Sequence, residues 1–132
     1  MHIDKKAGNE NVQNENAGYL LWFKDYLIDQ GLSLKTVDRH LKNLDFFLNE
    51  FLTSGGVRRM EDGLFAMDEY FGSYFMSHNK KASVGSLKSN AESIKKFYLC
   101  MFEHGKVTSS EYVVLCRDIK EGMPGWLRKS GN

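Results

Sequence analysis

Residues 33–52, SLKTVDRHLKNLDFFLNEFL, decide the fold of this chain. Their apolar side chains recur at alternating steps of four and three residues, a spacing that gathers them on one face of an α-helix. Ser33 is a good N-cap for such a helix, and the polar and glycine residues at 53–56 would end it. The stretch therefore predicts a long amphipathic helix. Its buried face is formed by Val37, Leu41, Leu44, Leu48 and Phe51.

Helical patterns also lie on both sides of this stretch. Residues 18–30 place Phe23 and Leu27 on one face, and Gly31 then supplies a helix stop. Residues 66–77 predict a shorter, aromatic-rich helix. No segment shows the strict alternation of a strand, so we expect an all-α protein.

Two more helices are predicted in the second half of the chain. Ser83 is the N-cap of a fourth helix that ends at Gly105. Ser109 or Ser110 can cap a fifth helix, which Gly122 and Pro124 would close. The buried stripe expected on the fourth helix is Leu87, Ala91, Ile94, Tyr98 and Met101.

Length and composition suit one small helical domain with polar ends. The chain has 132 residues, of which 42% are apolar, and this is enough to bury a core. Residues 1–17 lack an apolar period and predict a flexible polar tail. We expect the helical domain at 18–122 and a C-terminal tail at 123–132, where Trp126 and Leu127 can dock back.

The second and fourth predicted helices match at an offset of 50 residues. Two interpretations are open, because any two capped amphipathic helices align by their common period. The alternative is a pair of stacked helical hairpins that present the starts of both longer helices on the same side. The matched pairs are Ser33/Ser83, Thr36/Ser86, Val37/Leu87, Leu44/Ile94, Phe47/Phe97 and Leu48/Tyr98.

The stretch from 23 to 48, FKDYLIDQGLSLKTVDRHLKNLDFFL, combines an aromatic-rich helix, the triplet Gly31-Leu32-Ser33, and Thr36 before a Leu- and Phe-studded helix. The later stretch from 83 to 107 combines a Ser-capped helix, a basic and aromatic run, and a Gly turn. In this order and spacing, the motifs resemble the core-binding domain of tyrosine recombinases, the phage-type integrases. The resemblance covers roughly residues 18–108.

This resemblance implies a compact bundle of four to five helices, arranged as two crossed hairpins of the SAM-like type. In that family the domain forms one half of a clamp around DNA, and a separate C-terminal domain carries the cleaving tyrosine. None of those catalytic residues can be transferred onto this chain. After Val107 the family runs into an Asn-Pro linker, whereas this chain continues as TSSEYVVLCRDIKEG.

The total charge does not favour DNA, since 18 Lys and Arg face 17 Asp and Glu. Their positions do favour it, because Lys35, Arg39 and Lys42 form one stripe on a helix. Lys88 and Lys95 share a second stripe. The alternative is that these are ordinary solvated helix faces. The expected DNA-contacting residues are Lys35, Thr36, Arg39, Lys42, Lys80, Lys81, Ser86, Lys88 and Lys95.

Other chemistry finds little support in the sequence. Cys100 and His104 have a spacing that can hold a metal on a helix, but no further ligands are evident. No acid–base or nucleophile set suggests an enzyme. No apolar run approaches the ~18 residues of a membrane span. We therefore expect no cofactor, metal, membrane or small-molecule substrate, and reduced cysteines in a cytoplasm.

Together these observations predict a non-catalytic DNA-binding domain that positions duplex DNA for site-specific recombination or integration. A recombinase subunit or catalytic domain is the other expected partner. The alternative is a stand-alone protein-interaction module derived from the same fold, which the near-zero net charge and the fifth helix favour. Salt dependence separates the two, because phosphate contacts weaken steeply as salt rises.

Overall fold

The computed structural model describes residues 5–79 and 81–130, and all regular structure in these ranges is helical. The predicted all-α class is therefore confirmed for this part of the chain. None of the described helices combines the length and the apolar character that crossing a membrane requires. The chain divides into two compact units, residues 1–63 and residues 64–132, where a single helical domain was expected at 18–122. The division arises because most helix packing is between neighbours within each unit.

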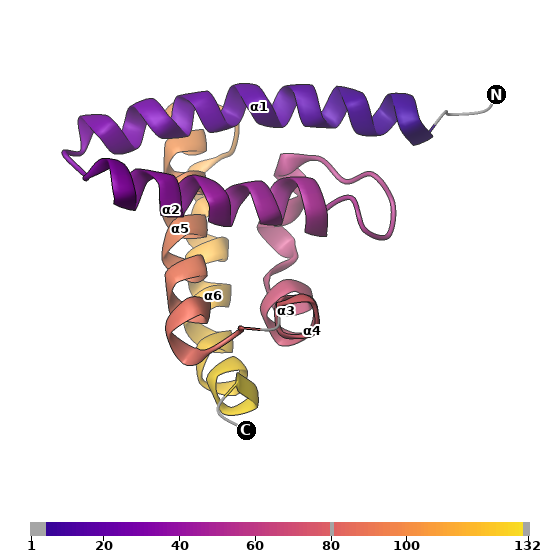
Figure 1. Cartoon of the computed structure of the whole chain (residues 1–132), viewed down its shortest axis with the longest axis vertical. Coiled ribbons are helices and arrows are strands. Elements are labelled where there is room, and N and C mark those ends of the chain that lie inside the picture. The colour runs from indigo at the N-terminus through magenta and orange to yellow at the C-terminus, as the bar shows by residue number, and fades with distance from the viewer. Residues whose placement is uncertain (1–4, 80, 131–132) are drawn as a thin grey trace. The chain divides into compact units, whose positions relative to one another are not determined.

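The first unit is built on a helical hairpin. In Figure 1, α1 (Lys5–Asp29) and α2 (Leu34–Asp45) run side by side, and they pack on each other. Gly31 joins them at a φ of 80°, and its N–H donates to the Ile28 carbonyl at 2.9 Å, which confirms the predicted helix stop. The second helix continues as the π-helix η1 (Phe46–Phe51).

The first helix begins much earlier than the sequence predicted. Residues 5–17 were expected to form a polar tail, but they are the first half of α1. Val12 and Asn16 are buried within this part, and the Asn16 side-chain amide donates to Asn49 Oδ1 at 2.8 Å. The expectation failed because a buried, hydrogen-bonded asparagine occupies a position where the apolar pattern requires a hydrophobic residue.

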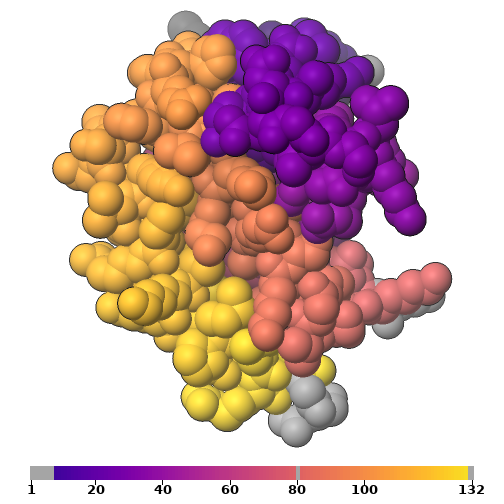
Figure 2. All heavy atoms as spheres, turned by 90° about the vertical axis from the view of Figure 1, so that its left-hand side faces the viewer, coloured from indigo at the N-terminus to yellow at the C-terminus, as the bar shows by residue number. Residues whose placement is uncertain are grey.

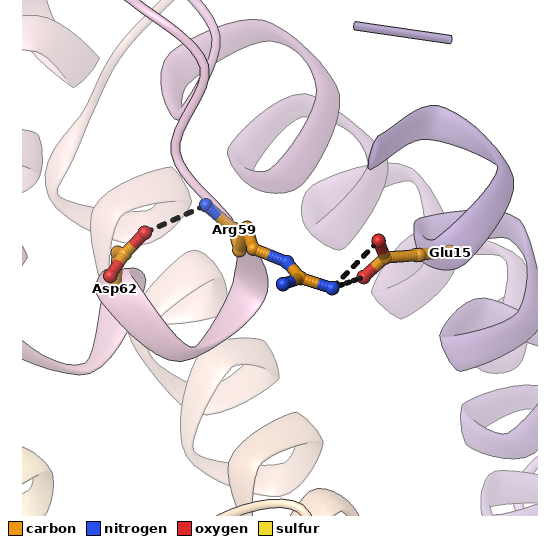
Figure 3. A network of polar contacts seen from close by, with 3 residues as sticks. All are labelled: Glu15, Arg59 and Asp62. Atoms are coloured by element: carbon orange, nitrogen blue, oxygen red, sulfur yellow. Dashed lines mark hydrogen bonds and ion pairs between the residues drawn. The ribbon is translucent and has the colours of Figure 1, made fainter. Parts of the chain in front are cut away.

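A polar link holds the same half of α1 to the segment after η1 (Figure 3). Arg59 Nη2 lies 2.8 Å from both carboxylate oxygens of Glu15, and the Arg59 backbone N–H donates to Asp62 Oδ2 at 2.8 Å. Asp62 belongs to the 3-10 helix η2 (Met60–Phe65). Polar contacts therefore tie residues 15 and 16 of α1 to two other segments of the first unit.

The second unit contains a short helical run and a second hairpin. α3 (Met67–Glu69), the π-helix η3 (Tyr70–Tyr74) and α4 (Phe75–His78) follow one another without a break, as predicted for residues 66–77. They are followed by α5 (Val84–Glu103) and α6 (Ser109–Ser130), which pack against each other. Gly105 turns the chain between them at a φ of 73°, as predicted.

The caps of α5 and α6 differ in how well the sequence predicted them. Ser83 caps α5 as expected, since its hydroxyl oxygen accepts the Ser86 N–H at 3.1 Å. The cap of α6 is Thr108, not Ser109 or Ser110. The Thr108 hydroxyl oxygen accepts the Glu111 N–H at 3.1 Å, and the Glu111 carboxylate accepts the Thr108 N–H at 2.8 Å. Glu111 selects the cap because only the residue three positions before it can complete this reciprocal pair.

The helix α6 continues past Gly122 and Pro124, where the sequence predicted its end. The expected C-terminal tail at 123–132 is therefore helical as far as Ser130. Gly122 is a packing position, because a Cβ there would overlap the Trp126 ring. Trp126 is buried, and the centroid of its ring lies 5.1 Å from the ring centroid of Phe71. Its Nε1–H donates to Asp68 Oδ1 at 2.9 Å. These contacts hold α6 in helical form beyond Pro124, and they confirm that Trp126 docks back.

Candidate nucleic-acid interface

The first group of predicted DNA contacts lies on α2. Lys35, Arg39 and Lys42 are all exposed. Lys42 Nζ lies 3.0 Å from Asp38 Oδ2, and both side chains are largely in solvent. A surface ion pair of this kind is weak and screened by salt, so a phosphate can replace the carboxylate. The acidic neighbour still lowers the local positive potential of this stripe.

Thr36 and Ser86, which were predicted to contact DNA, have a structural role. The Thr36 N–H donates to Ser33 Oγ at 3.2 Å, and the Ser33 hydroxyl donates to Thr36 Oγ1 at 3.0 Å. Ser86 forms a complete capping box, because its hydroxyl oxygen also accepts the Ser83 N–H at 2.8 Å. Both side chains are half-buried at the starts of α2 and α5. They stabilise the helix ends that any phosphate would approach.

The second group lies on and before α5. Lys81, Lys88 and Lys95 are exposed, while Lys80 lies outside the described residues. The first turn of α5 contains no acidic residue. The capping box uses the N–H groups of Ser83 and Ser86, and it leaves those of Val84 and Gly85 outside it. A helix start of this kind favours an anion, because its amides and its dipole both point positive charge outward.

Charge divides unequally between the two units, whose boundary at residue 63 only the structure reveals. Residues 1–63 contain eight Lys and Arg against ten Asp and Glu, a net charge of −2. Residues 64–132 contain ten Lys and Arg against seven Asp and Glu, a net charge of +3. The positive potential of the protein is therefore concentrated in the second unit.

The two lysine-bearing helices also differ at equivalent positions. At the offset of 50 residues, Asp38 corresponds to Lys88, Lys42 to Glu92, and Asp45 to Lys95. Asp45 is in addition an acceptor for the Asn49 side-chain amide at 2.7 Å. Of the predicted basic contacts, the structure thus places three on α2 and three on and before α5, but the two stripes are not copies of one another.

Metal and thiol chemistry gain no support from the described residues. They contain no group of three or more His, Cys, Asp or Glu side chains able to hold a metal ion. Cys100 is fully buried, and burial raises the pKa of its thiol to about 11, so the thiol is neutral near pH 7. His104 is exposed at the end of α5.

Comparisons with known proteins add no family or fold assignment. No protein-family model, curated protein or solved structure matches the chain.

Proposed function

We propose that this chain is a non-catalytic, helical DNA-binding domain that positions duplex DNA for site-specific recombination or integration. The observation that carries the proposal is the concentration of positive charge in the second unit, with Lys81, Lys88 and Lys95 exposed on and before α5. Lysines placed in this way displace counterions from the phosphate backbone, which is the main source of affinity for duplex DNA.

The start of α5 is the proposed centre of the phosphate contact. Lys81 and Lys88 flank the first turn, where the amides of Val84 and Gly85 lie outside the capping box. Gly85 has no side chain that would hold a phosphate away from the backbone. Phosphate contacts set position and register, whereas they carry no base sequence information. The proposed role is therefore to hold DNA, with any strand cleavage performed by a recombinase subunit or catalytic domain.

In this proposal, the first unit contributes less to the affinity for DNA than the second unit does. Lys35, Arg39 and Lys42 supply a second basic stripe, but Asp38 lies within reach of Lys42 and the unit carries a net negative charge. The resemblance to recombinase core-binding domains suggests the SAM-like type of helical bundle, with crossed helical hairpins, for this chain.

Salt-dependent duplex binding tests the proposal. Fluorescence anisotropy of a labelled duplex is measured with the full chain between about 50 and 200 mM salt. The Lys88→Glu, Lys95→Glu double variant should bind about tenfold more weakly at low salt, and its salt slope should fall by about two. Lys106→Glu, in the turn that follows α5, is the control and should lose little affinity. Binding that does not depend on salt, or an equal loss in the control, would contradict the proposal.

A further inference from the structure

A second surface lies between α5 and α6, on the side of the second unit seen in Figure 2, where α5 in salmon to orange borders α6 in yellow. The two helices enclose an open groove of about 940 Å³. It lies within the second unit, and the DNA-binding proposal does not account for it. Its lining includes Leu99 from α5 and Tyr112, Cys116, Met123 and Leu127 from α6.

The groove combines an apolar floor with a positive rim. The floor residues Leu99, Met123 and Leu127 are half-buried, so they retain apolar surface that a partner could cover. Lys95, Lys96 and Lys120 lie along the groove together with a single acidic residue, Glu92. The fixed charge of the lining is therefore +2, which favours an occupant that is apolar on one side and acidic at its edges.

The dimensions of the groove favour a helix as that occupant. Its lining on α6 extends from Tyr112 to Leu127, which corresponds to about 22 Å, or about four helical turns. An open groove between two helices covers one face of a third helix and leaves its polar face in water. A single alkyl chain would keep much of its surface exposed in an open groove, so it gains less from binding there.

We propose that the α5–α6 groove binds an acidic amphipathic helix of a partner protein. The apolar side chains of that helix, spaced by three and four residues, would cover Leu99, Met123 and Leu127. Its carboxylates would face Lys96 and Lys120. This inference goes beyond DNA binding, and of the proposed DNA contacts only Lys95 belongs to the groove.

The chain contains its own reporter for this groove. Cys116 lines it and is half-buried, whereas Cys100 is fully buried with a neutral thiol. Iodoacetamide should therefore react with Cys116 much faster than with Cys100. An occupant of the groove should slow this reaction, while a ligand bound elsewhere should not. Cys116→Ser identifies the reaction by abolishing the fast phase.

The test uses two synthetic peptides of about 16 residues with identical leucine spacing. One carries glutamate at all remaining positions near the apolar face, and the other carries lysine there. We expect the acidic peptide to slow alkylation of Cys116 at least fivefold and the basic peptide to leave it nearly unchanged. Equal protection by both peptides, or protection by neither, would overturn the proposal.

Charge variants and two further ligands complete the test. The Lys96→Glu, Lys120→Glu variant should lose the protection, whereas Lys88→Glu with Lys106→Glu changes the charge equally outside the groove and should retain it. Circular dichroism verifies that both fold. Dodecanoate that protects Cys116 where the acidic peptide fails would assign the groove to a small amphiphile, and protection by duplex DNA would assign it to the DNA surface. Either result would overturn the proposal, while loss of DNA binding alone leaves it intact.

Discussion

Residues 33–52 in the first unit and residues 83–102 in the second unit bury side chains at six equivalent positions and carry opposite charges at three exposed ones. Both stretches begin with a capping serine, and both bury one face for about five turns. Their exposed positions pair Asp38 with Lys88 and Asp45 with Lys95. The equivalent buried residues are Val37/Leu87, His40/Asn90, Leu44/Ile94, Phe47/Phe97, Leu48/Tyr98 and Phe51/Met101.

The two stretches also differ in how an equivalent position is used within each unit. Asn49 lies in the π-helix η1 and accepts a hydrogen bond from Asn16 of α1. The equivalent residue of α5, which stays α-helical, is Leu99, and it lines the groove beside α6. Burial therefore constrains one face of each helix, whereas positions that are exposed or half-buried differ in charge and in their contacts. Function must therefore be sought in the differences.

The largest effect on stability should come from the equivalent buried positions of the two stretches. Phe47→Ala and Phe97→Ala should each lower the free energy of unfolding by about 3–5 kcal/mol, because both side chains are fully buried. Urea denaturation followed by circular dichroism measures the change. Phe102, which is 40% exposed, provides the control, and its replacement by alanine should cost much less. A marginal loss at either buried phenylalanine would show that the two cores are not equivalent.

Removing the N-cap hydrogen bonds should have a smaller effect on stability, and this effect should differ between α2 and α5. Ser33→Ala removes one cap bond and should cost about 1 kcal/mol. The Ser83→Ala, Ser86→Ala double variant removes both bonds of the reciprocal capping box and should cost more, up to about 2 kcal/mol. Thermal and urea unfolding of each variant provide the measurement. Ser109→Ala serves as the control, since Thr108 caps α6. The opposite order of the two losses would argue against the capping box.

Giving α2 the charge of α5 should improve DNA binding. Asp38→Lys places a lysine at the position equivalent to Lys88 and removes the carboxylate beside Lys42. Duplex affinity at low salt should rise about threefold, with a salt slope steeper by about one. Glu50→Lys makes the same change in charge at an exposed position of η1. An equal gain in this control would mean that net charge alone, and not the α2 stripe, governs binding.

Alkaline pH should act on the protein through a position where the two helices differ. Position 50 holds an exposed glutamate, whereas α5 buries Cys100, and burial raises the pKa of that thiol from 9.0 to about 11. The unfolded thiol ionises first, so this contribution to stability is complete below about pH 9 and is lost as the pH rises through 11.

The measurement is the free energy of unfolding at about pH 8 and about pH 10.5. Cys100→Ala should reduce the decline between these values without abolishing it, because burial also raises the pKa of Tyr70 and of Tyr19. Cys116→Ala should leave the decline unchanged. A decline of equal size in all three proteins would exclude Cys100 as its source.

The helices that the sequence predicted well are those whose local signals agree. At Ser33, Gly31, Ser83 and Gly105, cap or stop chemistry coincides with the ends of an apolar period, and the structure confirms each of these ends. Where one signal contradicted another, the prediction was wrong. Asn16 interrupts the apolar pattern of α1, although Val12 and Tyr19 continue it on the buried face. Gly122 carries a stop signal, although Trp126 occupies the space beside it.

The candidate surfaces were predicted less completely than the fold. The sequence placed Lys35, Arg39 and Lys42 on one stripe of α2, because helical spacing alone determines which residues share a face. It did not predict the groove, since Leu99 and Lys120 come from different helices and only the packing of α5 on α6 brings them together. It also did not predict that the hydroxyl groups of Thr36 and Ser86, two of the predicted DNA contacts, bond to the helix caps.

By itself, the sequence determined the all-helical class, the buried stripe of α5, most of the buried stripe of α2 and most helix ends. These depend on the period of apolar residues and on hydrogen bonds between residues close in the chain. Only the tertiary structure decided that α1 begins at Lys5, that α6 continues past Pro124, and that a lysine-rimmed groove lies between two helices. Those features depend on contacts between distant residues, such as Asn16 with Asn49 and Trp126 with Asp68, and such contacts override local propensity.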